Sequence, residues 1–217
     1  MSEFDSRRLI LDRIKVALNA DSSEARSEQQ RSEWLGLPRS YRQGGVLDET
    51  DRIELFEARI RHYNAATYHS NGDIAEDIAQ ILTERRKRVL VVPRGFPELW
   101  LPQNFMFIVD ENLRYDQLGS CDGVLTACTV AIALTGTIVL ASSAEEGRRA
   151  VTLIPDYHLC VLRREDIVEF VPEAFEKLES VKTQPLTFIS GPSATVDIEM
   201  TRVRGVHGPR TLDVLIA

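Results

Sequence analysis

Apolar residues recur at helical spacing in two segments near the amino terminus. In residues 5–19 the apolar face consists of Leu9 or Ile10, Ile14 and Leu18. The same spacing returns in residues 51–64, through Ile53, Phe56, Ile60 and Tyr63. These two patterns predict two amino-terminal helices.

The chain between these helices is polar. Residues 19–50 are rich in Ser, Glu, Gln, Arg and Gly, a composition that buries little apolar surface. We therefore expect an extended connector. Its apolar residues, Trp34, Leu35 and Leu37, are candidates to dock against the body or against another subunit.

From about residue 66 short β-branched runs alternate with helical segments. The expected strands are Ala66–His69, Val89–Val92, Phe105–Val109, Gly123–Thr126, Thr137–Leu140, Leu159–Leu162, Leu186–Ile189 and Leu212–Ile216. The expected helices lie near Ile74–Leu82, Leu113–Leu118, Ile167–Val171 and Pro172–Ser180. This alternation predicts an α/β fold, with a mostly parallel sheet between helices. The expected organisation is helices and a connector in residues 1–65, followed by an α/β domain in residues 66–217.

Composition and charge narrow the function classes. Of the 217 residues, 43% are hydrophobic and 27% charged, as in an ordinary globular protein. There is no apolar run as long as a membrane span and no secretory signal pattern, so we expect a cytoplasmic protein without a membrane span. With 26 basic against 33 acidic residues the net charge is −7, which disfavours nucleic-acid binding.

The three cysteines do not have the spacing of a metal site. Cys121, Cys128 and Cys160 form no C-x-x-C pair. Buried, reduced thiols are the expected outcome. We therefore expect no metal and no cofactor in this chain.

Two loops next to expected strands combine glycine with hydroxyl groups. Thr135, Gly136 and Thr137 precede one strand, and residues 190–199 follow another, with Gly191, Ser193 and Thr195. Glycine permits a sharp turn, and hydroxyls and free amides can converge on one anion. If residues 194–200 begin a helix, its amino end would favour a carboxylate or phosphate. The alternative is a helix cap followed by a turn.

Two further groups in the carboxyl-terminal region could take part in proton transfer or anion binding. Asp197 and Glu199 could form an acid/base pair or lie on a solvated face. His207, between Gly205 and Gly208 in the loop, could act as acid or base, and Arg210 offers a fork for a carboxylate. The alternative is that His207 and Arg210 only form hydrogen bonds with nearby carbonyls. The other three histidines, His62, His69 and His158, are interpreted as structural.

Taken as a whole, these segments resemble the LUD-domain family, in its lactate utilization protein C (LutC/YkgG) branch. The resemblance rests on Gly191–Glu199, on Gly205–Arg210, and on Ala131–Leu140 and Leu153–His158 upstream. It covers residues 85–217 well and the amino-terminal helices in outline. One position departs from the pattern, because Leu134 stands where many relatives have Glu. We therefore assign no acid/base role there.

The resemblance implies a fold similar to the NagB/RpiA/CoA-transferase group. It also implies a role in oxidising L-lactate to pyruvate together with iron–sulfur partner subunits that carry the clusters. On this hypothesis the site for a small carboxylate consists of Thr135, Gly136, Thr137, Gly191, Ser193, Thr195 and Arg210, with His207 and Asp197 as catalytic candidates. One alternative is a stand-alone enzyme acting on a phosphosugar or acyl-CoA. Another is a structural subunit whose connector around Trp34 docks a partner.

Overall fold

The fold is described from a computed structural model of the chain. It describes residues 3–17, 23–38, 40–195, 203–204 and 208–217. The chain divides into two compact units, Met1–Arg42 and Gln43–Ala217, and each is treated by itself.

The amino-terminal unit consists of two helices, α1 (Glu3–Ala17) and α2 (Ser23–Gly36). The helix predicted over residues 5–19 is confirmed as α1 as far as Ala17, and Leu9, Ile10 and Ile14 of its apolar face are exposed. Residues 18 and 19 lie outside the described residues. The extended connector expected from residue 19 is wrong for Ser23–Gly36, which is helical. The segment lacks an apolar face, but it is rich in residues that favour helices. The side-chain amide of Gln29 also donates a hydrogen bond to the Glu33 carboxylate one turn later, over 3.0 Å.

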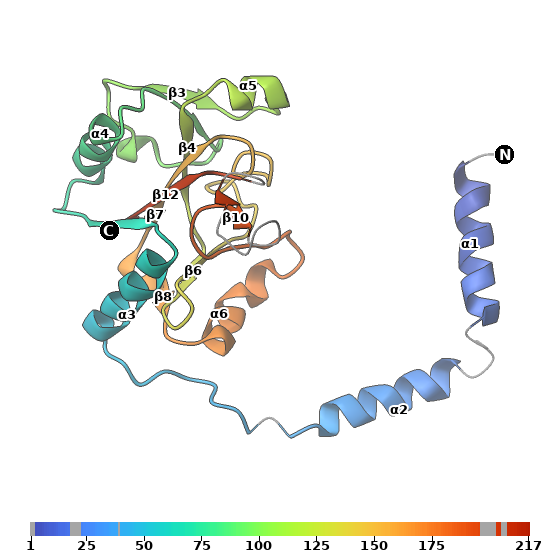
Figure 1. Ribbon diagram of the computed structural model, residues 1–217. Helices are drawn as coiled ribbons and strands as arrows, with labels where there is room; N and C mark the ends of the chain where they lie inside the picture. The colour runs from blue at the N-terminus through green and yellow to red at the C-terminus, as the bar shows by residue number, and fades with distance from the viewer. Residues whose placement is uncertain (1–2, 18–22, 39, 196–202, 205–207) are drawn as a thin grey trace. The chain divides into compact units, whose positions relative to one another are not determined.

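A six-stranded parallel sheet forms the centre of the second unit (Figure 1). In spatial order its strands are β1 (Ala66–His69), β12 (Thr211–Ile216), β7 (Tyr157–Leu162), β4 (Gly123–Ala127), β2 (Val89–Val92) and β3 (Met106–Val109). The central strands are almost wholly buried and mostly apolar, because helices or a second sheet cover both faces; Thr126, His158 and Asp213 are buried polar residues within them. The predicted α/β fold, with a mostly parallel sheet flanked by helices, is confirmed.

Each face of this sheet has its own core. On one face α4 (Ile74–Glu84), capped by Asp73, packs Ile78 and Leu82 in one cluster with Leu90 and Leu159 of the strands. On the other face α3 (Glu49–His62) contributes Phe56 and Ile60 to a cluster that includes Cys160 and Val214. The short α5 (Tyr115–Gly119) adds Leu118 to a smaller cluster. The 3-10 turns are η2 (Glu98–Trp100), η3 (Arg164–Asp166) and η4 (Glu179–Val181).

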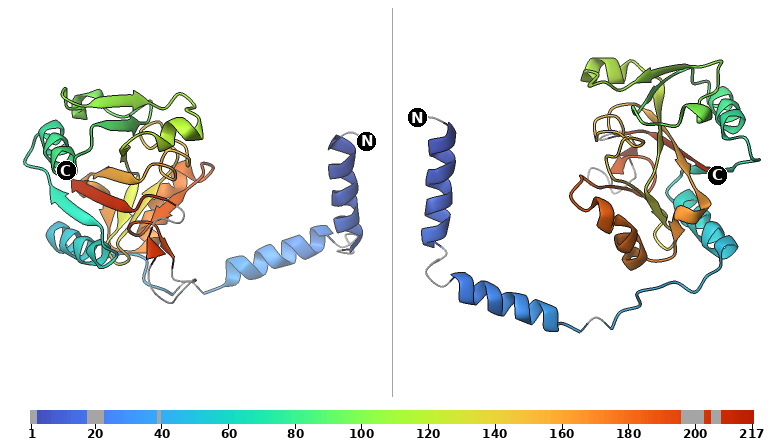
Figure 2. Two further views of the ribbon diagram at one scale, coloured as in Figure 1. Left: turned by 45° about the horizontal axis from the view of Figure 1, so that its top comes forward. Right: turned by 180° about the vertical axis from the view of Figure 1, so that it is seen from behind.

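A second, four-stranded sheet shares the core with α3. Its order is β8 (Ile167–Val168), β5 (Val130–Ile132), β6 (Thr137–Leu140) and β9 (Thr187–Ile189). The helix α6 (Val171–Leu178) packs on its outer face, and Figure 2 shows α4 (green) and α6 (orange) on opposite sides of the unit. A two-residue ladder joins β10 (Ala194–Thr195) to β11 (Val203–Arg204).

One local prediction is wrong in this region, and two further segments differ from what was considered. The helix expected over Ile167–Val171 is a strand at Ile167–Val168, because these β-branched residues pair with β5. The strand β5 lies in an apolar segment for which the sequence analysis predicts no strand. The helix that the sequence analysis considers as one alternative for residues 194–200 does not begin at Ala194, because Ala194 and Thr195 pair with β11.

The residues just before α3 are held by hydrogen bonds to Glu169. The buried carboxylate of Glu169 accepts hydrogen bonds from the amides of Val46 and Leu47, over 2.6 and 2.8 Å. Gly45 packs directly against Glu169, where an added Cβ would lie 2.6 Å from the Glu169 Cβ. These contacts join residues 45–47, which precede α3, to the compact unit Gln43–Ala217.

Gly136 lies in the turn between β5 and β6, and a substitution there tests how closely this turn packs against α3. Its φ is +60°, and an added Cβ would lie 2.6 Å from the Ile60 amide nitrogen. We expect Gly136→Ala to lower the free energy of unfolding by about 2–5 kcal/mol, from left-handed backbone strain and overpacking together. Urea denaturation measures the change.

The matched control is Gly44→Ala, where nothing lies within 4 Å of the added Cβ. It should shift the free energy of unfolding by no more than about 0.5 kcal/mol. Equal stability of the two variants would contradict the close packing of the β5–β6 turn against α3.

Candidate functional site

A cavity of about 310 Å³ lies against the sheet face that also faces α3. Its floor is His158 of β7 and Leu212 of β12. Loops from distant parts of the chain provide the walls: Arg149, Thr152, Phe188, Ile189, Ser190, Gly191, Pro192, Ser193, Ala194, Gly208 and Pro209. A volume of this size is typical of small-molecule sites.

The two hydroxyl-bearing loops singled out in the sequence meet beside the cavity. Thr137 Oγ1 lies 2.7 Å from Thr135 Oγ1 and 2.7 Å from Ser190 Oγ. Gly191 has φ +98° and packs against Tyr63, where a Cβ would lie 2.4 Å from the Tyr63 Cβ. Among the predicted residues that the structure describes, Gly191 and Ser193 line the cavity. Thr137 contacts the cavity residue Ser190, and Thr135 contacts Thr137, but neither threonine is itself in the lining. Gly136 packs on α3.

Arg210 is engaged by a carboxylate of the protein. Its guanidinium donates to both oxygens of Asp156, over 2.5 and 2.8 Å, and its amide donates to the Asp156 carbonyl. The hydrogen bond from Arg210 lowers the pKa of Asp156. Arg210 is not part of the cavity lining, although its neighbour Pro209 is. The Pro209 carbonyl accepts a hydrogen bond from the Ser193 amide over 2.8 Å. The anion-binding role predicted for Arg210 stays a prediction.

Three other predicted site residues are described only in part or lie outside the described residues. Thr195 ends β10, and its place in the ladder with β11 is all that is described. His207 and Asp197 fall outside the described ranges. Their catalytic roles stay predictions.

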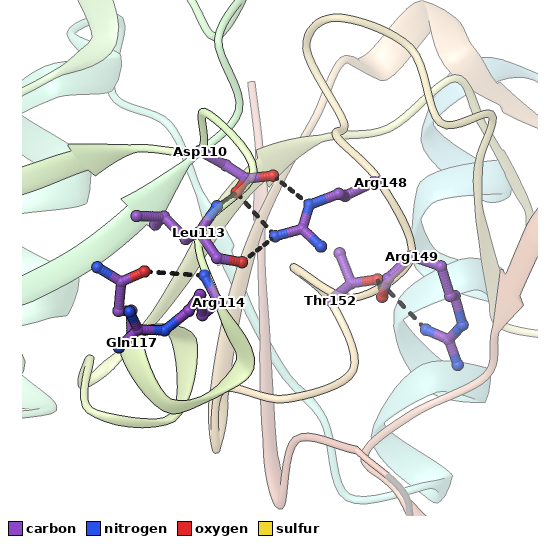
Figure 3. A network of polar contacts seen from close by, with 7 residues as sticks. All are labelled: Asp110, Leu113, Arg114, Gln117, Arg148, Arg149 and Thr152. Carbon is purple, nitrogen blue, oxygen red and sulfur yellow. Dashed lines mark hydrogen bonds and ion pairs between the residues drawn. The ribbon is translucent and has the colours of Figure 1, made fainter.

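Adjacent arginines in the loop after β6 turn to opposite sides (Figure 3). Arg148 donates to both oxygens of Asp110, over 2.8 and 3.0 Å, and to the carbonyl of Leu113. Burial opposes ionisation of Asp110, but hydrogen bonds from Arg148 and the Leu113 amide outweigh it, so its pKa is lowered. Arg149 points away from this cluster, lines the cavity, and donates to Thr152 Oγ1 over 3.2 Å.

Arg149 is an exposed residue of the cavity lining, and it has no counterion among the described residues. Arg148 is paired with Asp110 and Arg210 with Asp156, whereas no carboxylate of the described residues lies within ion-pair distance of Arg149. A cation of this kind, beside the side chains of Thr152, Ser190 and Ser193, can bind a carboxylate or a phosphate.

His158 is a neutral polar group in the cavity floor. The ring is buried, and its Nε2 lies 2.8 Å from the hydroxyl of Thr126, a buried residue of β4. Burial and the nearby charge of Arg149 lower the pKa of His158 to about 3. The imidazole therefore stays uncharged near neutrality, when one of its nitrogens donates a hydrogen bond and the other accepts.

The sequence analysis did not assign Arg149, His158 or Thr126 to the site. His158 was interpreted as structural; the structure buries it, and it is also one of the residues that line the cavity. A signal for Arg149 was present in the sequence, since it follows Gly147 in a loop after a buried strand. Nothing in that pattern distinguishes it from Arg148.

The thiols have the environment of core side chains. Cys121, Cys128 and Cys160 are buried and reduced. A hydrogen bond to Cys160, together with burial, raises the pKa of the Cys128 thiol, and burial raises that of Cys121. Within the described ranges, no three His, Cys, Asp or Glu side chains are arranged to hold a metal ion. In the same part of the chain, no helix has the length and apolar character needed to cross a membrane.

Comparison with known proteins connects this architecture to a family. Residues 108–217 match the model of the LUD domain. Lactate utilization protein C of Deinococcus radiodurans is 45% identical over 174 residues, which cover 78% of this chain and 81% of the relative. Lactate utilization protein C of Bacillus pumilus is 33% identical over 227 aligned residues, covering 94% of this chain and 92% of the relative.

A solved structure has the same fold. The crystal structure of a DUF162 family protein from Deinococcus radiodurans superposes with a TM-score of 0.68 at 38% sequence identity. The match covers 79% of this chain and 99% of that one. The family resemblance seen in the sequence is thereby confirmed, and the chain belongs to the LUD-domain family, in the branch of the lactate utilization protein C relatives.

Proposed function

We propose that this protein takes part in lactate utilization as a subunit that binds a small carboxylate in the cavity beside His158. The pathway is inferred from relatives that carry the name lactate utilization protein C. The chemistry is inferred from the cavity itself. A 2-hydroxy or 2-oxo acid such as lactate or pyruvate combines the two groups that this lining can recognise: a carboxylate and a neighbouring oxygen.

The observation that carries this proposal is the unneutralised guanidinium of Arg149 on the cavity wall. A guanidinium presents two parallel N–H groups that match the two oxygens of a carboxylate. The hydroxyls of Thr152, Ser190 and Ser193 lie on the same lining and offer further hydrogen bonds. The carboxylate of the ligand would therefore bind at the Arg149 side.

His158 suits the second oxygen of such a ligand. Its ring is held through Nε2 by Thr126, and it is uncharged near neutrality. A neutral imidazole can donate to a 2-oxo group or accept from a 2-hydroxyl, depending on its tautomer. The apolar walls formed by Phe188, Ile189 and Leu212 would surround the carbon skeleton.

In this proposal the electrons leave the substrate through other subunits. The family resemblance implies iron–sulfur groups carried by partner subunits in the cytoplasm, and the three buried thiols of this chain are consistent with that division. This chain would then contribute ligand binding and carry no cofactor of its own. The catalytic candidates His207 and Asp197 belong to the same proposal.

A second candidate function is a stand-alone enzyme acting on a phosphosugar or acyl-CoA. The size of the cavity favours it, because about 300–1,000 Å³ is the range of sites that hold ligands larger than a three-carbon acid. Arg149 and the hydroxyls would bind a phosphate as readily as a carboxylate. Turnover of such a compound by the isolated chain would favour this function over the first.

Growth on L-lactate tests the proposed pathway. A strain that lacks this gene and has no redundant lactate dehydrogenase should fail to grow on L-lactate as sole carbon source and grow normally on glucose. The wild-type gene should restore growth. Normal growth of the deletion strain on both carbon sources would contradict a role in lactate utilization.

The charge of Arg149 is tested by calorimetry with lactate and pyruvate. We expect Arg149→Gln to weaken binding by about 10–100-fold, since a charge-assisted hydrogen bond contributes about 1.5–3 kcal/mol. The matched control is Arg114→Gln, an exposed arginine paired with Asp116, which should leave affinity unchanged. The variant Arg210→Gln separates the two arginines. If it weakens binding and Arg149→Gln does not, the anion site lies at Arg210.

The buried neutral imidazole of His158 predicts a pH dependence of stability. Its pKa is about 3 in the folded chain and 6.5 as a free side chain, so the unfolded chain binds the extra proton between these values. The contribution of His158 to the free energy of unfolding is fully present above about pH 6.5 and is lost as the pH drops. From this residue alone, the free energy of unfolding should fall by about 2 kcal/mol between pH 7 and pH 5.

The measurement is urea denaturation of the wild type and of His158→Asn at both pH values. Subtracting the two pH dependences removes the contribution of other groups, including the buried Glu146, whose pKa burial raises. The variant should lose the His158 contribution. The same pH dependence in both proteins would show that His158 is not held neutral by burial.

A further inference from the structure

The edge strand β3 leaves backbone groups unpaired toward the outside of the sheet. Within the part of the chain that the structure describes it pairs only with β2, in parallel register, and it lies at the outer edge of the unit (Figure 1). On the side that faces β2, the Met106 amide donates to the Arg88 carbonyl and the Asp110 amide donates to the Val92 carbonyl, each over 2.9 Å. In a parallel ladder alternate residues face the neighbour, so the N–H and C=O groups of Phe107 and Val109 face outward.

The side chains of this edge are apolar. The strand reads Met-Phe-Ile-Val, with Met106 60% and Val109 43% exposed. Proteins usually protect an exposed edge with lysine, proline, a bulge or a covering element. β3 contains no lysine or proline. Among the described residues, the outward amides of Phe107 and Val109 have no hydrogen-bond acceptor.

The opposite edge of the same sheet is polar. β1 reads Ala-Thr-Tyr-His, and its Thr67 hydroxyl and His69 ring both contact the Glu57 carboxylate, over 2.6 and 3.1 Å. These polar side chains make β1 a poor surface for another strand. The contrast indicates that β3 is the edge suited to pairing.

Charges of opposite sign lie at the two ends of β3. Arg86, Lys87 and Arg88 line a surface cavity with Asn104 and Phe105, beside the beginning of the strand. Glu111 follows the end of the strand, and its side chain is 68% exposed in a surface pair with Arg94. Antiparallel pairing of two such edges would bring each basic end beside an acidic end.

We propose that β3 pairs with β3 of a second copy of this chain, in antiparallel register about a two-fold axis at Ile108. Phe107 then lies opposite Val109 of the second copy, and the outward N–H of each donates to the outward C=O of the other. The two six-stranded sheets form one continuous sheet. The interface is isologous, as a closed dimer requires.

Sedimentation equilibrium of the full chain, with amide exchange at Phe107, tests this pairing. The wild type should be a dimer at micromolar concentration, and its Phe107 amide should exchange slowly. Val109→Lys places a charge within the paired edge and should raise the dimer dissociation constant by roughly tenfold or more, with fast exchange at Phe107. Circular dichroism confirms that the variant is folded.

Val171→Lys is the matched control, because Val171 is a partly exposed apolar residue on α6, next to the other sheet. It should remain a dimer with a protected Phe107 amide. A monomeric wild type would overturn the proposal. A dimer that Val109→Lys leaves intact would overturn it too, since the copies would then meet elsewhere, for example through the exposed apolar residues of α1.

Discussion

The position of the positive charge in the cavity depends on the ion pair between Arg148 and Asp110. The Asp110 side chain is 6% exposed, so a partner must compensate its charge, and Arg148 does so with both guanidinium bonds. This contact fixes the loop after β6 to the end of β3. Because consecutive side chains in an extended or irregular segment diverge, fixing Arg148 on one side leaves Arg149 on the other, toward the cavity (Figure 3).

The other walls of the cavity are joined to one another by polar contacts across large distances in sequence. Thr137 holds Ser190, the Ser193 amide binds the Pro209 carbonyl, and Asp156 binds Arg210 just before β12. Each link uses a group that the sequence analysis considered for ligand binding. Some of those hydroxyls and charges therefore build the site, while Arg149 and His158 are residues of its lining.

The strands were predictable and the site only in part, for physical reasons. Val89–Val92 and Thr137–Leu140 are short β-branched runs whose pattern is local, and both are strands with the expected bounds. The pairing of Ile167 with Ala131, in contrast, depends on residues far apart in sequence. The meeting of the Thr137 and Ser190 loops could be expected from their places beside strands. The direction of Arg149 could not, because a loop has no periodicity to show which of two adjacent arginines is already paired.

The most direct test of the account is a crystal structure of the full chain with pyruvate at saturating concentration. The account predicts a ligand in the cavity beside His158, with its carboxylate within hydrogen-bond distance of the Arg149 guanidinium and its 2-oxo group on the His158 side. The Arg148–Asp110 and Arg210–Asp156 pairs should remain intact. A carboxylate bound to Arg210 in place of Asp156, or an empty cavity with pyruvate bound elsewhere, would contradict the account.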